Sequence, residues 1–321
     1  MHLIADAIDF DEYAKTPPDA ARVKPASHWC QEVIDRFYNP ETRRGTLLPW
    51  SKTHRHVALR PGEVSIWSGI NGHGKSLLLN QVMLAAMTQG ERVCIASMEM
   101  KPARTMERMS RQAAGAREPA IPFIKTLHAW TDGKLWIYDQ QGTVGSERII
   151  GVTRYCAEEL GITHMVIDSL MKCGIAEDDY NRQKSFIDEL CAHARDINIH
   201  AHLVTHSRKT DTERREQDKF DVKGSSSITD QVDNVFIAWR NKKKEDEAAR
   251  AEPRDTIMAE PDATVRCAKQ RHGEWEGKVA LWFDHDSMQF VGQKDAPPII
   301  YDLEALDERI AIQQEMGGLN P

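Results

Sequence analysis

The sequence predicts an α/β protein whose central, mostly parallel, twisted sheet is flanked by helices. Two observations support this fold class. From Gly62 onward, short apolar runs alternate with helical stretches, as in strands joined by crossover helices. A glycine-rich turn, SGINGHGKS (68–76), follows the first such run and precedes a helical stretch. Strands are expected in the runs VSIWSG, RVCIASM, KLWIYD, HMVIDSL, HAHLVTH, NVFIAWR, TVRCAKQR and KVALWF.

The segments before the sheet form an N-terminal arm, which we place at residues 1–46. Its first 27 residues are polar and broken by prolines, so no structure is predicted for them. In HWCQEVIDRFY (28–38), the apolar residues recur at near-helical spacing, which predicts a short amphipathic helix.

The α/β domain is expected over residues 47–293 and a C-terminal tail over 294–321. Within the domain, the charged and proline-punctuated stretch 241–262 predicts a mobile loop. In the tail, YDLEALDERIAIQQEM (301–316) predicts one last helix.

The composition of the chain excludes several classes of function. With 40% hydrophobic residues, the 321-residue chain can bury a substantial core, and its net charge of −7 excludes a globally basic nucleic-acid coat. No apolar run approaches the roughly 18 residues that span a bilayer, and the acidic start MHLIADAIDFDEY is unlike a signal peptide. Six cysteines without a C-x-x-C pair suggest free thiols in a reducing compartment. We expect a cytoplasmic protein without membrane association.

The glycine-rich turn has the spacing of a phosphate-binding P-loop, Gly69-x4-Gly74-Lys75-Ser76. Glycines let backbone amides curl around phosphate oxygens, Lys75 reaches the β- and γ-phosphates, and the Ser76 hydroxyl ligates Mg²⁺. The alternative is a glycine-rich turn with a chance Lys-Ser, which the strand before and the helix after disfavour. His73 is interpreted as pointing outward. The candidate nucleotide-binding residues of this segment are Gly69, Asn71, Gly72, His73, Gly74, Lys75, Ser76 and Leu77.

Two carboxylates follow strands near this loop. Asp168 ends the apolar run HMVID, where an acid is expensive unless it emerges at the sheet edge and holds Mg²⁺ through water. Glu99 lies just past the run CIASM and could polarise an attacking water. The alternative for Glu99 is an acid at the start of the next helix, where acids are favoured. Position alone does not separate these two readings.

Three histidines, His200, His202 and His206, alternate along one expected strand and its end. They are spread too far for one metal shell, and no nearby cysteine or carboxylate completes a site. A role for His206 alone, at the end of the strand beside the phosphates, is favoured.

CAKQRHGEW (267–275) places Lys269 and Arg271 on one face of a strand. Two long cations side by side repel each other unless an anion lies between them. The chain already has Lys75 for its own phosphates, so the second pair suggests another anion.

Taken in order, six motifs resemble the hexameric replicative helicases with a RecA-like core: the DnaB type, and most closely Twinkle and the helicase half of phage primase–helicases. The resemblance runs from Leu47 to Gly292. It implies a RecA-like P-loop NTPase core that uses ATP and Mg²⁺, and a helix at 28–38 that links to the neighbouring subunit. The motifs are SGINGHGKS, ASMEM, VIDSL, VTHSRK, DVKGSSSITDQVDNVFIAWRN and AKQRHGEWEG.

The resemblance also implies roles for single residues. Glu99 becomes the catalytic base and His206 the sensor of the γ-phosphate. Lys269 and Arg271 become the piston lysine and the arginine finger that act on a neighbouring subunit's nucleotide.

The resemblance further places Arg240 and Phe283 around the nucleotide base, although an exposed arginine and a core phenylalanine are the alternatives. DNA contact falls on HSRKTDTERREQDKFDVKGSSS (206–227), whose cations, amides and hydroxyls track phosphates without reading bases. The candidate DNA-binding residues are Arg208, Lys209, Lys223, Gly224, Ser225 and Ser226.

The expected function is that of a stand-alone, ring-forming, ATP-driven replicative DNA helicase of phage or prophage origin. The resemblance implies 5′ to 3′ movement on single-stranded DNA and a hexamer. No primase domain or zinc-binding cysteine pattern is found, so a separate primase and DNA polymerase are expected as partners. The alternatives are a RecA/RadA-like recombinase, a non-hydrolysing ATP-binding assembly module, and a small-molecule P-loop kinase that would need an acceptor pocket.

Overall fold

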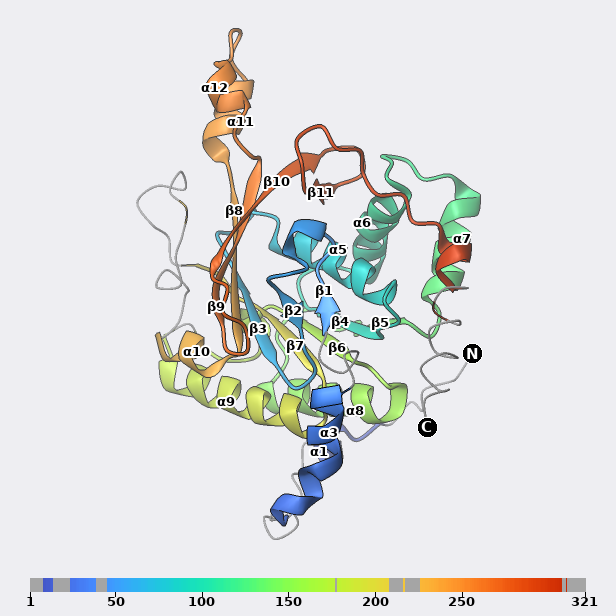
Figure 1. Ribbon diagram of the computed structural model, residues 1–321, viewed down its shortest axis with the longest axis vertical. Helices are drawn as coiled ribbons and strands as arrows, with labels where there is room; N and C mark the ends of the chain where they lie inside the picture. Colours follow the sequence, from blue (N-terminus) through green and yellow to red (C-terminus); the bar gives the residue numbers. More distant parts are fainter. Residues whose placement is uncertain are drawn as a thin grey trace.

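The computed structural model describes residues 8–13, 24–38, 45–176, 178–207, 216, 226–307 and 310. These residues form a nine-stranded sheet in the order β11-β10-β9-β8-β3-β7-β6-β4-β5 (Figure 1). The six strands from β8 to β5 are parallel, and β9, β10 and β11 add antiparallel strands at one edge. The strands are β3 (Val64–Ser68), β4 (Val93–Ser97), β5 (Leu135–Ile137), β6 (His164–Asp168), β7 (His200–Val204), β8 (Asn234–Arg240), β9 (Ala263–Gln270), β10 (Gly277–Asp284) and β11 (Gln289–Val291).

All eight predicted strands are therefore present. The structure adds three that were not predicted: β11, and a two-stranded ribbon of β1 (Thr46–Leu47) and β2 (Ala58–Leu59). Each has only two or three residues, too few for a period of two to register.

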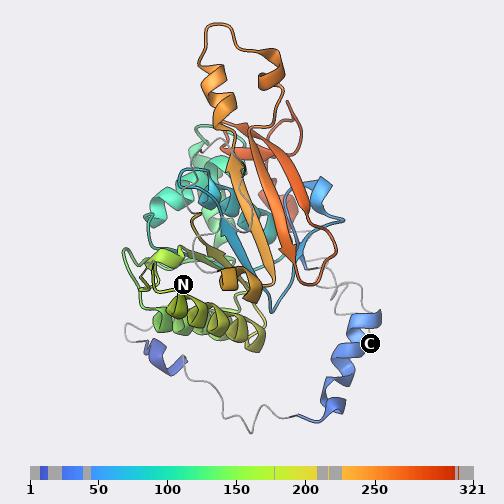
Figure 2. The same ribbon diagram turned by 90° about the vertical axis from the view of Figure 1, so that its left-hand side faces the viewer.

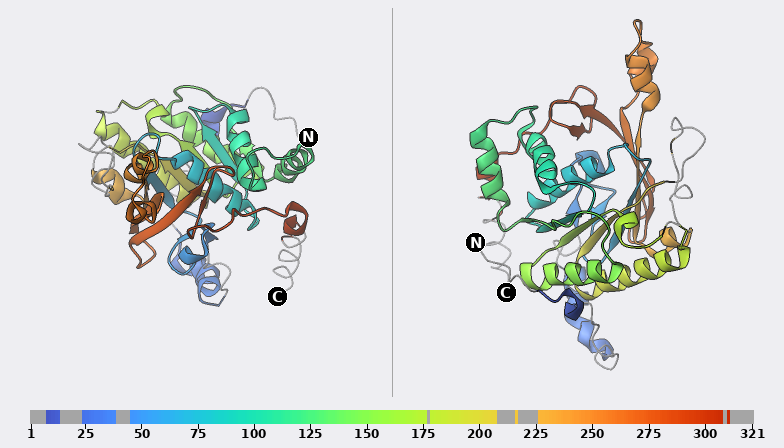
Figure 3. Two further views of the ribbon diagram at one scale, coloured as in Figure 1. Left: turned by 90° about the horizontal axis from the view of Figure 1, so that it is seen from above. Right: turned by 180° about the vertical axis from the view of Figure 1, so that it is seen from behind.

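Helices cover both faces of the sheet. The helices α5 (Lys75–Met87), α6 (Pro102–Ala114) and α7 (Ile121–Thr131) share one apolar core. The helices α8 (Ser146–Leu160), α9 (Tyr180–Asp196) and α10 (Ser226–Gln231) share the other, and α8 and α9 run together along that face (Figure 3). Central strands feed both cores: Ile95 packs on the α5 side and Cys94 on the α8 side. This double burial explains why the strands read as continuous apolar runs.

The prediction of a mobile loop at 241–262 is wrong. The chain there forms α11 (Lys242–Ala248) and α12 (Asp255–Met258), a helical hairpin that projects beyond the sheet (Figure 2). Its charges are paired within the hairpin. Asn241 caps α11 by accepting the Lys244 amide at 3.0 Å, and the buried Glu247 carboxylate lies 2.6 Å from the Arg254 guanidinium. The prolines, at 253 and 261, fall outside both helices.

The N-terminal arm contains the expected helix, as α3 (Cys30–Tyr38) preceded by a 3₁₀ turn, η1 (Ala26–Trp29). Its apolar residues stay exposed, with Trp29 at 50% and Phe37 at 68%. A short helix that was not predicted, α1 (Phe10–Tyr13), packs on α8.

In the C-terminal tail, residues 303–307 are helical, and residues 308, 309 and 311–316 of the predicted last helix lie outside the described part of the chain. Two further 3₁₀ turns are η2 (Ser51–Thr53) and η3 (Leu170–Lys172). Among the described helices, none has the length and apolar character needed to cross a membrane.

Candidate functional site

The glycine-rich turn joins β3 to α5 in a backbone conformation that requires glycine. Gly69 and Gly74 have φ values of 151° and 80°. A Cβ at Gly69 would lie 2.4 Å from the Ala238 carbonyl oxygen, and one at Gly74 would lie 3.2 Å from Phe290 Cζ. Substituted residues would thus push the loop away from β8 and β11, both of which it contacts.

A cavity of about 800 Å³ opens beside this turn, within the size range of ligand pockets. All the predicted nucleotide-binding residues line it except Gly69, and so do Glu99, Asp168 and His206. The lining residues from the turn and the start of α5 are Asn71, Gly72, His73, Gly74, Lys75, Ser76 and Leu77.

Lys75, the first residue of α5, is buried at the floor of this cavity. Its Nζ donates to the carbonyl oxygens of Gly69 at 2.8 Å and Ile70 at 3.1 Å. Burial lowers the pKa of Lys75 to about 8, and the carboxylates of Asp168 and Glu99 oppose this shift. An ammonium held only by neutral carbonyls in a buried site is well suited to binding an anionic phosphate.

Asp168 and Glu99 face the same cavity from adjacent strands but have different partners. The Ser76 hydroxyl donates to Asp168 Oδ2 at 2.6 Å. Burial raises the pKa of Asp168, the Ser76 hydrogen bond lowers it, and the charge of Glu99 raises it. Two carboxylates and a serine hydroxyl are hard oxygen ligands, the type that Mg²⁺ prefers.

Glu99 does not cap the next helix. Its Oε1 accepts the Ser169 hydroxyl at 3.1 Å, on the cavity side, and α6 begins only at Pro102 with Lys101 as its N-cap. This geometry favours the interpretation as a catalytic base over the helix-cap alternative.

His73 does not point outward, so that prediction is wrong. The side chain is 3% exposed, and its Nδ1 accepts the Arg240 amide at 3.2 Å. The physical reason is the strand order: β8 pairs with β3, so the end of β8 runs past the turn that follows β3.

Arg240 and Phe283 both line the cavity. The Arg240 guanidinium forms an ion pair with Glu245 on α11 and donates to the Gly72 carbonyl at 3.4 Å. Phe283 packs against Phe290, with ring centroids 5.0 Å apart. The structure thus brings a planar cation and an aromatic ring to the same cavity, as the base-binding interpretation requires.

Several residues that line the cavity were missed. They lie on elements that the sequence did not predict, or on an amphipathic helix where an arginine is unremarkable. Glu245 lies on α11 in the stretch read as a loop, and Phe290 lies on the short β11. Arg108 lies in the second turn of α6, and its charge lowers the pKa of Asp168. No sequence signal distinguishes Arg108 from a surface residue.

His200 and His202 lie apart from His206 and from the cavity. They are buried in β7 beside His164 of β6, with the rings stacked or tilted against one another. Among the described residues, no group of three or more histidines, cysteines or carboxylates could hold a metal ion.

The hydrogen bonds around these histidines define which nitrogen of each ring carries the proton. The Trp67 indole can only donate, so His202 Nδ1 accepts it at 3.1 Å and His202 Nε2 donates to His164 Nδ1 at 3.0 Å. His200 Nδ1 donates to the Arg60 carbonyl at 2.7 Å, and its Nε2 accepts the Ser65 hydroxyl at 2.7 Å. Burial lowers the pKa of His164 and of His200 to about 3. Burial also lowers the pKa of His202 well below its ordinary value, so all three rings are neutral near pH 7.

Lys269 and Arg271 do not line the cavity; they lie at the end of β9. The predicted DNA-binding residues Arg208, Lys209, Lys223, Gly224 and Ser225 lie outside the described part of the chain, and Ser226 begins α10.

The site combines a glycine-rich phosphate loop, a buried lysine, and carboxylates at the ends of two neighbouring parallel strands. These features define the class of P-loop nucleoside triphosphatases. Within this class, the family model described as "DnaB-like helicase C terminal domain" matches residues 55–292. The chain belongs to this family: it is a DnaB-like replicative helicase domain, a DNA helicase that binds nucleotide and hydrolyses ATP.

Solved structures confirm the RecA-like fold. "ATPase Domain of G40P" superposes with a TM-score of 0.69 at 16% identity and covers 85% of this chain and 100% of that one. "The Structure Of A DnaB-Like Replicative Helicase And Its Interactions With Primase" superposes with a TM-score of 0.65 at 15% identity and covers 85% of this chain and 68% of that one.

Proposed function

We propose that the protein is a ring-forming helicase that uses ATP and Mg²⁺ to move 5′ to 3′ along single-stranded DNA, with priming supplied by a separate protein. One observation carries the proposal. The cavity gathers Lys75, Ser76, Glu99 and Asp168, whereas Lys269 and Arg271 of the same chain lie outside it. A site that receives its last cations from a neighbour requires an oligomer.

Within the site, this chain's residues divide the work. Lys75 binds the phosphates, and Ser76 and Asp168 would hold Mg²⁺, which when bound neutralises phosphate charge. Glu99 accepts a proton from the attacking water, and His206 senses the γ-phosphate. Arg240 and Phe283 enclose the base.

The oligomer is proposed to be a hexameric ring. Residues 1–46 form the arm and linker helix, 47–293 the ATPase domain and 294–321 the tail. The exposed apolar face of α3 supports a linker helix that docks on the neighbouring subunit, because such a face is costly to leave in water.

Single-stranded DNA is proposed to bind through residues 206–226, by phosphate contacts that do not select sequence. A primase and a DNA polymerase are the expected partners; one of the similar solved structures is itself described with its interactions with primase. The non-hydrolysing alternative is less favoured, because the cavity retains a lysine, two carboxylates and a histidine suited to hydrolysis. The recombinase alternative is less favoured, because the family model that matches this chain is that of a DnaB-like helicase.

Mixing two inactive variants tests the shared site. Lys75→Ala should weaken both nucleotide binding and turnover, and Arg271→Ala should bind ATP but hydrolyse it about 10³–10⁵-fold more slowly, as expected for loss of an arginine finger. In mixed rings, some junctions pair an intact P-loop with an intact finger, so DNA-stimulated ATPase should partly return.

Subunit exchange, measured with two fluorescent labels, is the control for this experiment. Confirmed exchange with no recovered activity would contradict a role for Arg271 across the interface. Filaments instead of rings in electron micrographs with a non-hydrolysable nucleotide would favour the recombinase alternative.

A further inference from the structure

Lys269 and Arg271 are both held against the carboxyl end of α10. Lys269 Nζ donates to the carbonyl oxygens of Thr229 at 2.8 Å and Asp230 at 2.7 Å, and Arg271 Nη2 donates to that of Gln231 at 2.8 Å. The last carbonyls of a helix have no partner within it, so these cations satisfy them. Within the subunit, the side chains of Lys269 and Arg271 therefore bind the same group of carbonyl oxygens.

Asp233 adds a full negative charge to this contact. Its side chain is 2% exposed, and Oδ1 lies 3.2 Å from Arg271 Nη1. The Asp233 carbonyl also accepts the Arg271 amide at 2.8 Å, so the arginine is held through both its backbone and its side chain. A buried carboxylate is stable only when it is paired, so breaking its ion pair with Arg271 would be costly.

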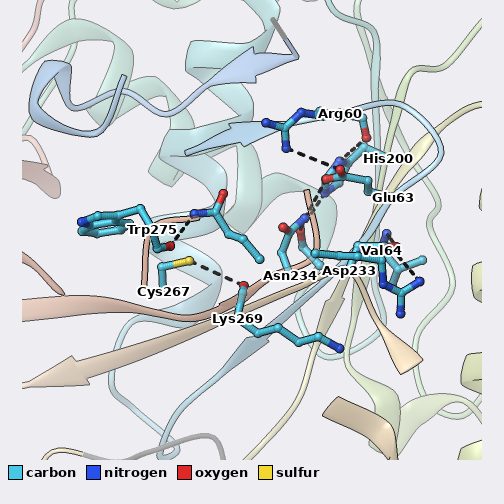
Figure 4. Close-up of polar contacts among 12 residues, drawn as sticks. Arg60, Glu63, Val64, His200, Asp233, Asn234, Cys267, Lys269 and Trp275 are labelled. Atoms are coloured by element: carbon cyan, nitrogen blue, oxygen red, sulfur yellow. Dashed lines mark hydrogen bonds and ion pairs between the residues drawn. The ribbon is translucent and has the colours of Figure 1, made fainter. Parts of the chain in front are cut away.

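The Asp233 carboxylate is itself fixed to the sheet. Its Oδ2 accepts the Val64 amide at 2.9 Å, at the start of the strand that leads to the P-loop (Figure 4). Its Oδ1 also lies 3.4 Å from Arg195 Nη2 on α9. The Val64 amide therefore fixes the Asp233 carboxylate to β3 through Oδ2, while Oδ1 faces the guanidinium groups of Arg271 and Arg195.

The intervening residue fixes the chain from the other side. Gln270 Nε2 donates to the carbonyl oxygens of His56 at 3.0 Å and Trp275 at 2.6 Å. The turn after β9 is thus held while the two cations face α10.

Both cations keep donors for a further acceptor. An ammonium has three N–H groups, and Lys269 uses two of them on α10. The Arg271 side chain is 38% exposed and has five N–H groups, so it can bind Asp233 and an external oxygen together.

We propose that Asp233 is a positioning residue for the cations that act on a neighbouring subunit's nucleotide. Asp233 holds Arg271 in place before the neighbour's phosphate arrives, and the end of α10 holds both Arg271 and Lys269. This inference rests on the proposed role of Arg271 across the interface. Preorganised donors lose no freedom at the moment of reaction, and misplacing such a group by about 1 Å costs roughly 100-fold in rate.

Asp233→Asn tests the proposal, because the amide is isosteric and its oxygen can still accept the Val64 amide. Removing the charge frees the Arg271 side chain, so kcat should fall by about 10–100-fold. The KM for ATP should stay within about twofold, since the chain's own P-loop is intact. Arg195→Gln is the matched control: it removes the other ion pair of Asp233 without touching Arg271, and kcat should not change.

Mixing locates the defect. Asp233→Asn mixed with Lys75→Ala should regain ATPase, because the second chain supplies an intact finger to the first chain's intact P-loop. Asp233→Asn mixed with Arg271→Ala should not, because both chains lack a positioned finger. The reverse pattern, or wild-type kcat in the single variant, would overturn the proposal.

The Asp233→Asn variant is taken as folded if its thermal unfolding midpoint lies within a few degrees of the wild-type value. If Asp233→Asn does not fold, Asp233→Glu takes its place, because it keeps the charge but moves it by one methylene, and the same pairing is expected. If Lys75→Ala and Arg271→Ala themselves fail to complement each other despite exchange, the proposed function fails first. If they complement each other, but Asp233→Asn does not recover with Lys75→Ala or does recover with Arg271→Ala, only the positioning role of Asp233 fails.

Discussion

The two carboxylates of the nucleotide cavity show how neighbouring residues of similar chemistry acquire different roles. Asp168 accepts the hydroxyl of Ser76, so these two oxygen ligands lie together, as their proposed role in holding a metal requires. Glu99 is held by Ser169 alone in the part of the chain that the structure describes. A carboxylate with one weak neutral partner keeps lone pairs available to accept a proton.

Glu99→Gln should therefore bind ATP normally but lose turnover by roughly 100-fold or more, the usual effect of losing a general base. Lys75→Ala should weaken both binding and turnover. Titration with a fluorescent nucleotide and single-turnover hydrolysis separate the two quantities. Glu107→Gln is the control, since Glu107 is an exposed acid on α6 that pairs with Arg104. Normal hydrolysis by Glu99→Gln would contradict the role of Glu99 as the catalytic base.

At the scale of elements, the contact between α1 and α8 depends on a glycine, Gly151, whose lack of a side chain lets α1 approach α8. Phe10 and Tyr13 pack edge-to-face on Tyr155, with ring centroids 5.6 and 5.4 Å away. The Phe10 backbone approaches α8 at Gly151, where an added Cβ would lie 2.2 Å from the Phe10 carbonyl oxygen. The glycine costs α8 helical stability and gives α1 its docking position.

Gly151→Ala should accordingly act in opposite directions with and without the arm. In a chain lacking residues 1–23, alanine should stabilise α8 by up to about 1 kcal/mol, from helix propensity alone. In the full chain the clash displaces α1, so this gain should vanish or reverse, and protease should cut the arm faster. Denaturant unfolding of the four chains measures the difference. Equal stabilisation in both backgrounds would show that α1 does not dock on α8.

At the scale of the whole molecule, the buried histidine network ties the sheet together. His164, His200 and His202 lie on two adjacent central strands and bond to groups on β1, β3 and the turn before β3. Burial lowers all three pKa values below the ordinary value of 6.5. The folded protein therefore excludes protons that the unfolded chain binds.

The sign of the pH dependence follows from these lowered pKa values. The stabilisation is fully present above pH 6.5 and is lost as the pH falls from 6.5 toward about 3. Each histidine that takes up its proton only on unfolding contributes a slope of up to about 1.4 kcal/mol per pH unit. Urea unfolding at pH 7, 6 and 5 measures the combined slope.

His202→Phe isolates one histidine of the network. The variant should be less stable at pH 7, because the Trp67 indole loses its acceptor. Its pH slope should be smaller than that of the wild type, whereas His272→Gln, at an exposed position, should leave the slope unchanged. An unchanged slope in His202→Phe would mean that other groups cause the acid sensitivity.

The sequence by itself determined the parallel sheet and the phosphate loop. Both are local patterns: strands buried on two faces read as apolar runs, and a turn that curls around phosphate needs glycines at fixed spacing. Glu99 and Asp168 could be singled out for the same reason, because each follows a strand at the carboxyl edge, where ligands bind in such sheets.

Only the tertiary structure decided which distant segments complete the site and how charges are paired. Strand order brought the end of β8 past His73, and a three-residue strand brought Phe290 to Gly74. The charged stretch 241–262 folded because its ions pair within a hairpin, which composition cannot show. Lys269 and Arg271 were visible as a repelling pair, but Asp233 as the partner of Arg271 required the packing of β9 against β8 and α10, because a pairing between charges depends on where the chain places them in space.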